Sequence, residues 1–451
     1  MVVVDNDDVC DNQFVTRGKR MTMYDFLKGK KLLVLGATES EIDIIKRAQS
    51  FGVYAIATDY NEDWSKSPAK KQANEGWNIN WADVDSLYAK CRENNVDGVV
   101  TGYTEMRVQV LIKLCERLGF PCYCNQEQLD ITRNKDLFKK TCRKYGLPVI
   151  KEYNSPDDVD EFPVIVKPVD KHGSIGISVA NNREELKKAY DYALESSLTQ
   201  KAIIEKYIRN GNKVNYTYAI RDGEIKLTST CDTLTSKLNG DLTVIQNAWL
   251  YPQRQESEAL KKVDANLRAM ISGIGIRYGT IFFSSFVDDN ANSLFFECGF
   301  RLSGSNKHAY LYRLGNVNYL DIYILHALTG STDGIIVNPN PEPNLKCLTL
   351  NYYAKAGIVS SINGFEKIQA LPECTLAKTF IKIGDECHDD KAILSKICRF
   401  SFCSESPAAL ANAADFANRT LDVRDTNGKD MIYDRINPLT VKNWWTPQKA
   451  K

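Results

Sequence analysis

Residues 162–177 read FPVIVKPVDKHGSIGI, in which Lys167 ends an apolar strand and a glycine-bearing loop follows within a few residues. Backbone N–H groups in a loop freed by Gly173 and Gly176 can converge on phosphate oxygens, and Ser174 can add a hydroxyl donor. Lys167 would supply a point charge, since a lysine on an apolar strand costs desolvation energy unless an anion meets it. The stretch predicts a phosphate-binding loop, although taken alone it would favour an edge-strand lysine beside a flexible hairpin.

Farther along the chain, the segment AIIEKYIRNG at 202–211 predicts a second apolar strand that ends in a polar turn. The four residues at its end, Glu205, Lys206, Tyr207 and Ile208, resemble a hinge that binds adenine. Backbone donors and acceptors of such a segment can bind the base while apolar neighbours press on the ring. An ordinary strand-to-turn connection explains the same residues equally well, and both interpretations stay open at this point.

A third segment, SLFFECGFRLSGS at 293–305, places Glu297 at the end of an apolar strand with Arg301 beyond it. Magnesium prefers few carboxylates plus phosphate oxygens, and a nearby arginine can neutralise charge on a transferring phosphoryl group or an acyl phosphate. The alternative is an i,i+4 ion pair on a helix, but Gly299 and Gly304 make a helix a poor fit. The segment therefore predicts a metal and reaction centre.

The N-terminal part of the chain alternates strands and helices. Apolar runs predict strands at 31–35, 53–58 and 97–101, and helical spacing of apolar residues predicts helices at 39–51, 84–94 and 106–118. This alternation implies a parallel sheet whose ligands bind beyond the carboxyl ends of the strands. The loops 36–41 and 101–105 lie at such ends and are either substrate-facing or simple polar turns.

A nicotinamide dehydrogenase is the competing interpretation of this N-terminal part. However, LGATESE at 35–41 supplies one glycine where the dinucleotide-binding fingerprint asks for three. No Ser-His-Asp nucleophile signature such as G-x-S-x-G is present either. Nicotinamide chemistry and covalent hydrolysis are therefore not favoured.

Four parts are expected along the chain, in an α/β and α+β multidomain fold. They are a polar leader (1–29), a Rossmann-like domain (30–125), a central domain that binds ATP and metal (126–335) and a small C-terminal α+β domain (336–451). The central part begins with a charged helix at 130–148 and continues as a hairpin-rich region with a turn at Asp222-Gly223. A helix near 406–419 is expected close to the C-terminus.

Composition and charge restrict the classes of function. Lys plus Arg number 58 against 57 Asp plus Glu, so no global field attracts nucleic acid or an anionic membrane. No run reaches the roughly 18 apolar residues of a membrane span, and the acidic start does not fit a signal peptide. The thirteen cysteines lack zinc-ligand spacing and are interpreted as reduced thiols. We expect a soluble, cytoplasmic protein.

The four histidines show no metal-ligand spacing, and a structural role is the default expectation for them. His172 lies in the glycine loop and His308 lies just beyond Arg301. These two could act as general acid–base groups because of their loop positions.

Together these parts resemble the ATP-grasp superfamily, specifically its carbamoyl-phosphate-synthetase-like and L-amino-acid-ligase-like members. The resemblance rests on the order of the Rossmann-like unit, the NKD at 134–136, the VIVKP strand, the GSIG loop, IIEKYI and FFECGFRLSG. It implies a pre-ATP-grasp domain followed by a two-lobed ATP-grasp fold. It also implies that Lys135 and Lys167 contact ATP phosphates and that Glu205 to Ile208 frame the adenine. By the same resemblance, Glu297 holds Mg²⁺ (or Mn²⁺), and Arg301 stabilises the reaction centre.

Three positions depart from the family pattern. The family usually reads E-x-N-P-R where residues 297–301 read ECGFR, so an asparagine ligand is missing. The acid expected one strand earlier falls where Ser284 or Ser285 stands, and we take Ser285 as the candidate metal ligand. Asp288, waters or phosphate oxygens could compensate. Lys213 stands at the position where the family commonly has a glutamate that meets the ribose.

These expectations favour an ATP-dependent carboxylate–amine ligase, or its carboxylate–thiol variant, in which ATP phosphorylates a carboxylate and a nucleophile then displaces phosphate. ADP and phosphate would be released, and the substrates would be a small-molecule carboxylate and an amine. The alternative is a nucleotide-binding regulatory or scaffold protein whose degenerate metal site has lost turnover. No nucleic-acid or membrane partner is expected, and a homodimer is left open.

Overall fold

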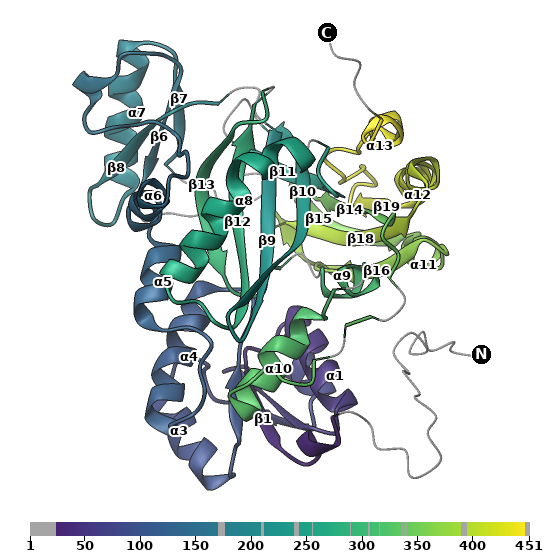
Figure 1. The fold of residues 1–451 in the computed structure, drawn as a ribbon. Helices are drawn as coiled ribbons and strands as arrows, with labels where there is room; N and C mark the ends of the chain where they lie inside the picture. Colours follow the sequence, from purple (N-terminus) through teal and green to yellow (C-terminus); the bar gives the residue numbers. More distant parts are fainter. Residues whose placement is uncertain are drawn as a thin grey trace.

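The structure is a computed structural model that describes residues 24–446 except 170–175, 209–211, 239–242, 255, 289, 305–306, 315, 336, 339–340 and 389–394. The described strands form four sheets, and the predicted α/β and α+β multidomain fold is confirmed (Figure 1). Within these residues, no helix is long and apolar enough to cross a membrane.

The N-terminal unit is a parallel four-stranded sheet in the order β3-β2-β1-β4. Its elements are β1 (Lys31–Leu35), α1 (Ile42–Ser50), β2 (Tyr54–Thr58), α2 (Pro68–Gln72), β3 (Glu75–Trp77), α3 (Val84–Glu93), β4 (Gly98–Val100) and α4 (Glu105–Leu118). The predicted alternation of strands and helices is confirmed, whereas α2 and β3 were not anticipated. Leu32 to Leu35 are completely buried, as expected for a parallel strand covered on both faces.

Helix α10 (Tyr319–Thr329) packs against this N-terminal sheet although it comes much later in the sequence (Figure 1). Every residue of α10 from Tyr319 to Leu328 is buried. Arg47 of α1 pairs with Asp321 of α10, with 2.7 Å between Nε and Oδ1. The N-terminal unit is therefore completed by a distant segment, and the predicted domain limits of 30–125 stay a prediction.

The single charged helix predicted over 130–148 is wrong, because two helices meet at Asn134. They are α5 (Gln126–Arg133) and α6 (Lys135–Lys144). The Asn134 side-chain oxygen accepts hydrogen bonds from the amides of Asp136 and Leu137, at 2.9 and 3.1 Å. An asparagine in this role begins a helix. Lys135 consequently occupies the first position of α6.

A small lobe contains four strands in the order β5-β8-β6-β7, with α7 (Arg183–Ser196) against them (Figure 1). The strands are β5 (Glu152–Tyr153), β6 (Val164–Pro168), β7 (Ser178–Ala180) and β8 (Ala202–Lys206). Antiparallel pairing sets Lys167 of β6 opposite Ile203 of β8, two residues from Glu205. Lys167 and Glu205 therefore lie on neighbouring strands and can meet.

The largest sheet has eight strands in the order β13-β12-β9-β10-β11-β14-β18-β16. They are β9 (Asn212–Arg221), β10 (Glu224–Leu238), β11 (Thr243–Tyr251), β12 (Gly279–Val287), β13 (Ser293–Phe300), β14 (Lys346–Tyr353), β16 (Cys374–Thr379) and β18 (Lys396–Ser404). Asp222 and Gly223 have φ values of 49° and 89° and make the predicted turn between β9 and β10. Because β11 pairs with β14, strands from both sides of the predicted 335/336 boundary share this sheet.

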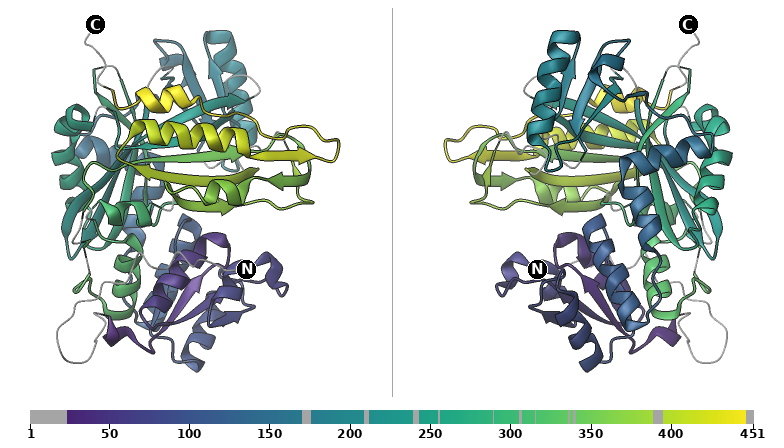
Figure 2. Two further views of the ribbon diagram at one scale, coloured as in Figure 1. Left: turned by 90° about the vertical axis from the view of Figure 1, so that its right-hand side faces the viewer. Right: turned by 90° about the vertical axis from the view of Figure 1, so that its left-hand side faces the viewer.

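Helices and a small sheet complete the fold. The helices are α8 (Glu256–Gly273), α9 (His308–Arg313), α11 (Phe365–Gln369), α12 (Pro407–Thr420) and α13 (Pro438–Asn443), and α12 matches the helix expected near 406–419. Strands β15 (Gly357–Asn363), β17 (Glu386–Cys387) and β19 (Asp422–Asp425) form a three-stranded sheet. Figure 2 shows this C-terminal part above the N-terminal unit, and Lys378 of β16 reaches Asp43 of α1 at 2.8 Å.

Candidate active site

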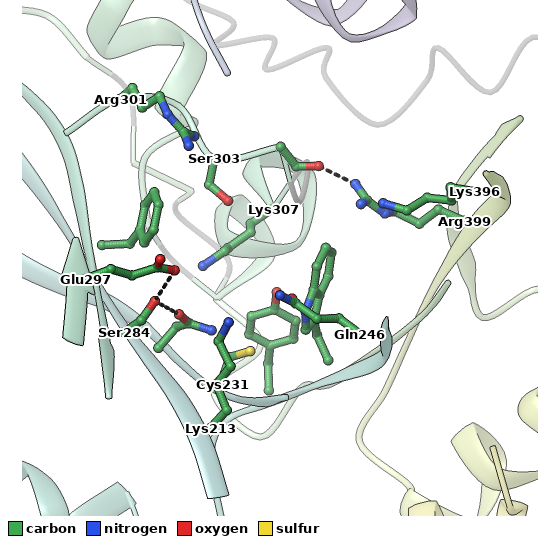
Figure 3. Close-up of a pocket in the computed structure, with 15 residues that line it drawn as sticks. Lys213, Cys231, Gln246, Ser284, Glu297, Arg301, Ser303, Lys307, Lys396 and Arg399 are labelled. Carbon is green, nitrogen blue, oxygen red and sulfur yellow. Dashed lines mark hydrogen bonds between the residues drawn. The ribbon is translucent and has the colours of Figure 1, made fainter. Parts of the chain in front are cut away.

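One face of the eight-stranded sheet borders a pocket of about 310 Å³ (Figure 3). Its walls come from β9 to β13, from β18 and from the segment between β13 and α9. The cationic residues that line the pocket are Lys213, Arg301, Lys307, Lys396 and Arg399, and the acidic residue is Glu297. Positive charge therefore exceeds negative charge in this pocket.

Three oxygen-bearing side chains stand side by side at one end of the pocket. Strand register pairs Ser284 of β12 with Glu297 of β13 and with Asn215 of β9. The Ser284 hydroxyl oxygen lies 2.7 Å from Asn215 Oδ1 and 3.4 Å from Glu297 Oε1 (Figure 3). Asn215 Nδ2 donates to Thr233 Oγ1 at 3.2 Å, which directs the amide oxygen of Asn215 toward Ser284. Paired residues on adjacent strands present their side chains to the same face, so the three oxygens converge.

Ser285, the predicted metal ligand, lies on the other face of β12. It is completely buried next to Tyr216, whereas Ser284 lines the pocket beside Glu297. Side chains alternate along a strand, so only one of two successive serines can face Glu297. The sequence left this choice open. The structure places Ser284, and not Ser285, beside Glu297, and a metal at this position stays a prediction. Asp288 instead accepts backbone hydrogen bonds in the turn after β12.

Lys135 and Lys167 share one charged region with Glu297. Burial lowers the pKa of Lys135, and the neighbouring positive charge of Lys167 adds to this effect. The negative charges of Glu297 and Glu205 act in the opposite direction. Charges influence one another this way only when they are near each other. Lys135 therefore lies within electrostatic reach of both Lys167 and Glu297, and the contact of the two lysines with ATP phosphates stays a prediction.

Glu205 is the centre of an ion-pair cluster in the small lobe. It is 2% exposed and pairs with Lys139 of α6 and Lys167 of β6. Lys139 also lies 2.5 Å from Glu152 Oε1. Burial alone would raise the pKa of Glu205, but Lys167 and Lys139 outweigh burial and lower it below its ordinary value. The Glu205 carboxylate is therefore charged and neutralised by protein side chains.

The remaining residues of the predicted hinge use part of their backbone within the lobe. The amide of Lys206 donates to the Lys151 carbonyl at 3.0 Å. The amide of Tyr207 donates to the Pro163 carbonyl at 2.9 Å. Ile208 is half-buried. These two amides are consequently not available to a base, and adenine binding by this segment stays a prediction.

Part of the predicted phosphate loop, with His172, Gly173 and Ser174, lies outside the described residues. Gly176 is described, with a φ of +72°. A Cβ at this position would lie 2.6 Å from Pro168 Cγ, so only glycine fits there without displacing β6. Gly176 is therefore sterically restricted at the point where the chain enters β7.

His308 lies away from the pocket lining. Its Nε2 is 3.6 Å from Asp43 Oδ2, between α9 and the N-terminal unit. Burial lowers the pKa of His308, which favours the neutral imidazole. This placement indicates a structural role rather than the acid–base role considered from its loop position.

Arg301 connects the pocket to the N-terminal unit. Its Nε lies 2.7 Å from Glu105 Oε1, at the start of α4. The guanidinium carbon is 5.4 Å from the ring centre of Phe282. The predicted strand-end loop 101–105 therefore reaches the site through Glu105.

The Phe282 ring also fills the space beside Gly299, since a Cβ there would lie 2.5 Å from Phe282 Cζ. This space cannot take the asparagine expected from the family pattern unless Phe282 moves.

Four further cationic residues line the pocket. Lys213 lies near the start of β9, and its exposure is intermediate. Lys307, just before α9, donates to Thr217 Oγ1 at 2.8 Å, and burial lowers its pKa. Lys396 and Arg399 come from β18 and lie opposite Glu297 in Figure 3. The predicted contact of Lys213 with a ribose stays a prediction.

Sequence reasoning missed several of these residues. The stretch KVNYTY at 213–218 alternates polar and apolar residues, and this period of two could have placed Asn215 on one face with Lys213. Lys396 and Arg399 have no comparable local signal, because the order of strands in the sheet brings β18 to the pocket. The N-terminal and central parts of the site were therefore more accessible to prediction than the C-terminal part.

The residues beside Glu297 fit a magnesium ion. Glu297, Ser284 and Asn215 offer a carboxylate, a hydroxyl and an amide oxygen, all of which are oxygen donors suited to Mg²⁺. Among the described residues, no cluster of three or more His, Cys, Asp or Glu could hold a metal by itself. Mg²⁺ usually binds through one or two carboxylates together with phosphate oxygens and waters. A single acid with two neutral donors is therefore compatible with Mg²⁺ bound to a nucleotide.

Comparisons with known proteins give both a family match and sequence relatives. Residues 114–271 match the family model described as "D-ala D-ala ligase C-terminus". A formate-dependent phosphoribosylglycinamide formyltransferase from Methanocaldococcus jannaschii is 28% identical over 195 residues, which cover 40% of this chain and 49% of that protein. The corresponding protein of Histophilus somni is 25% identical over 194 residues, covering 40% and 48%. The chain thus spans about half the length of these curated relatives.

Several solved structures have a similar fold over most of the chain. An L-amino acid ligase from Bacillus licheniformis has a TM-score of 0.71 at 18% identity, covering 89% of this chain and 100% of that one. A phosphoribosylglycinamide synthetase from Anaerococcus prevotii has a TM-score of 0.68 at 17% identity, covering 88% and 100%. A biotin carboxylase in a β-γ-ATP complex from Campylobacter jejuni has a TM-score of 0.70 at 16% identity, covering 90% and 93%. Residues 114–271 therefore match an ATP-grasp family model, and the chain has the fold of these solved structures over most of its length.

Proposed function

We propose that this protein is an ATP-dependent ligase that activates a carboxylate as an acyl phosphate and joins it to an amine, releasing ADP and phosphate. In a variant of the same chemistry, a thiol takes the place of the amine and accepts the acyl group. The observation that carries the proposal is that Lys135 lies within electrostatic reach of Lys167 and of Glu297, and that Glu297 lines a pocket rich in cationic residues. The names of the relatives, which include a ligase, a synthetase and a formyltransferase, support the same reaction class.

In this proposal ATP lies between the small lobe and the eight-stranded sheet. Lys135 and Lys167 contact its phosphates, together with the loop that contains Gly173, Ser174 and Gly176. Glu205 positions Lys167 through their ion pair. The segment from Glu205 to Ile208 and the Lys213 side chain are assigned to the adenine and ribose.

Glu297 holds Mg²⁺ (or Mn²⁺), with Ser284 and Asn215 as the neutral donors. The metal ion neutralises charge on the phosphates when it is bound. Glu297 also lies within electrostatic reach of Lys135, whose pKa responds to the Glu297 charge. Ser285 is not part of the set, since it faces Tyr216.

The carboxylate substrate binds in the pocket near Arg301 and Lys307. One of its oxygens attacks the γ-phosphorus, the bond to the bridging oxygen breaks, and ADP leaves. The amine then attacks the acyl carbon, the carbon–oxygen bond breaks, and phosphate departs while the nitrogen loses a proton. Arg301 offsets the negative charge that develops on the transferring group. We expect the small lobe to close over ATP, because an acyl phosphate must be protected from water.

ADP release with pools of small carboxylates and amines tests this function. A productive pool should release ADP only with Mg²⁺, and hydroxylamine in place of the amine should trap the acyl phosphate as a hydroxamate. Glu297→Gln should abolish both signals, whereas Lys140→Met, an exposed change on α6, should not. ATP binding without ADP release from any pool would refute the ligase and support the regulatory or scaffold alternative.

Location and assembly are further parts of the proposal. We retain a cytoplasmic location, because ATP and small metabolites are the expected ligands. A homodimer is suggested by one similar structure, a dimer of the biotin carboxylase domain from Hydrogenobacter thermophilus. Sedimentation or light scattering of the purified chain tests this assembly.

A further inference from the structure

The end of the pocket opposite Glu297 is formed by two basic residues of the C-terminal part. Lys396 and Arg399 project from β18 toward the pocket (Figure 3). Neither residue lies within the region 114–271 that matches the family model. This end of the pocket is therefore built by a part of the chain that the family match does not explain.

Arg399 is held in a fixed orientation. Its Nε donates a hydrogen bond to Asn351 Oδ1 at 2.9 Å, and its Nη1 donates a second hydrogen bond to the Gly304 carbonyl oxygen. Its guanidinium carbon lies 4.6 Å from the ring centre of Trp249. These contacts fix the direction in which the guanidinium points at this end of the pocket.

Lys396 is a half-buried lysine beside a second basic residue. Its Nζ lies 5.5 Å from the ring centre of Tyr353 and 5.2 Å from that of Phe380. Burial, together with the nearby charge of Arg399, lowers the pKa of Lys396 to about 7. No ion pair involving Lys396 is found in the described part of the chain. A bound anion would relieve both the burial cost and the repulsion from Arg399.

The two ends of the pocket divide the cations into separate groups. Arg301 and Lys307 lie toward Glu297, and Lys396 and Arg399 lie toward the far wall (Figure 3). Trp249 also lines the pocket, as a neutral side chain. A ligand that spans this pocket therefore meets positive charge at both ends.

We propose that the carboxylate substrate carries a second anionic group, a carboxylate or a phosphate, that Lys396 and Arg399 bind. This inference rests on the proposed ligase function, since the first carboxylate is the one that reacts near Arg301. Lys396 and Arg399 then act as specificity residues rather than as catalytic residues. The substrate class is a small dianionic acid, which a neutral-tailed carboxylate of similar size does not replace.

Matched pairs of compounds test this second binding site. The pairs are glutarate and butyrate, aspartate and asparagine, and phosphoserine and serine, each offered with Mg²⁺, ATP and hydroxylamine. The dianionic member should have a KM about tenfold lower, because one charge-assisted hydrogen bond strengthens binding by about tenfold. The aspartate and phosphoserine arms distinguish a carboxylate site from a phosphate site.

Lys396→Gln is the informative variant, and Lys367→Gln on the exposed face of α11 is its control. Lys396→Gln should raise the KM of the preferred dianionic compound about tenfold and leave its neutral partner unchanged. Lys367→Gln should change neither. An equal loss for both members of a pair, or no preference for the dianionic member, would overturn the proposal.

Calorimetric binding of the same compounds separates this proposal from the ligase proposal. If no compound supports ADP release but a dianionic compound binds and Lys396→Gln weakens that binding, the second site stands and the ligase activity fails. If ADP release occurs equally well with neutral-tailed acids, the ligase activity stands and the second site fails. If none of the six compounds binds or turns over, the second site also fails.

Discussion

Two groups of lysines near the site differ in how their charges are balanced. In the small lobe, Lys139 and Lys167 are paired with the buried carboxylate of Glu205. In the pocket, Lys307 is also buried, but it donates to the neutral hydroxyl of Thr217. A protein carboxylate balances the charges of the first group, whereas the neutral contact of Lys307 leaves its charge to the proposed substrate. The two groups therefore differ in how much of their charge the protein itself balances before a ligand binds.

The largest effect is expected at the carboxylate of the pocket. Glu297→Gln should lower kcat/KM by at least about 100-fold, since it removes the carboxylate that we propose as the metal ligand. Initial rates of ADP formation measure this loss. The pair Ser284→Ala and Ser285→Ala sharpens the result, because Ser284 lines the pocket and Ser285 does not. A loss from Ser285→Ala as large as that from Ser284→Ala would contradict the assignment of the metal-binding face.

The next effect concerns stability in the lobe. Glu205→Gln leaves Lys139 and Lys167 without their shared carboxylate and should lower the free energy of unfolding by about 3 kcal/mol. Glu195→Gln, an exposed change on α7, is the control. Urea denaturation measures both variants. Lys396→Gln should not destabilise the protein in this way. It removes a positive charge, whereas Glu205→Gln leaves two lysines without their counter-charge. Equal destabilisation by Glu205→Gln and Lys396→Gln would remove the distinction between the two clusters.

A smaller effect is expected at the contact between the pocket and the N-terminal unit. Glu105→Gln weakens the ion pair that orients Arg301 and should lower kcat about tenfold with little change in the KM for ATP. Glu116→Gln, an exposed change on the same helix, should leave both constants unchanged. Steady-state kinetics with varied ATP separate these outcomes. A change confined to the KM for ATP would show that Glu105 does not act through Arg301.

Much of the fold could be predicted from local patterns. Apolar runs bounded by turns predicted β1, β2 and β4, and Asp222-Gly223 predicted the turn after β9. The break at Asn134 was missed because the charged stretch has helix-forming residues on both sides of it. The placement of α10 on the N-terminal sheet depends on tertiary packing, and no pattern within 319–329 indicates it.

The candidate site, too, could be predicted from local patterns only in part. Lys167, Glu297 and Arg301 could be nominated because each lies in a segment with a chemical pattern of its own, whereas Lys135 was nominated through the family resemblance. The choice between Ser284 and Ser285 required the register of β12 against β13. Asn215 required a third strand in the same register. Register and strand order are set by long-range pairing, so the sequence alone could not supply them.

The most direct test of the account is calorimetric titration of Mg·ATP into Lys135→Met and Lys140→Met, two changes on the same helix. Lys135 shares its charged region with Lys167 and Glu297, whereas Lys140 is exposed. We predict that Lys135→Met weakens ATP binding about tenfold or more and that Lys140→Met leaves it unchanged. Unchanged ATP affinity in Lys135→Met would contradict the claim that Lys135, Lys167 and Glu297 meet around one triphosphate.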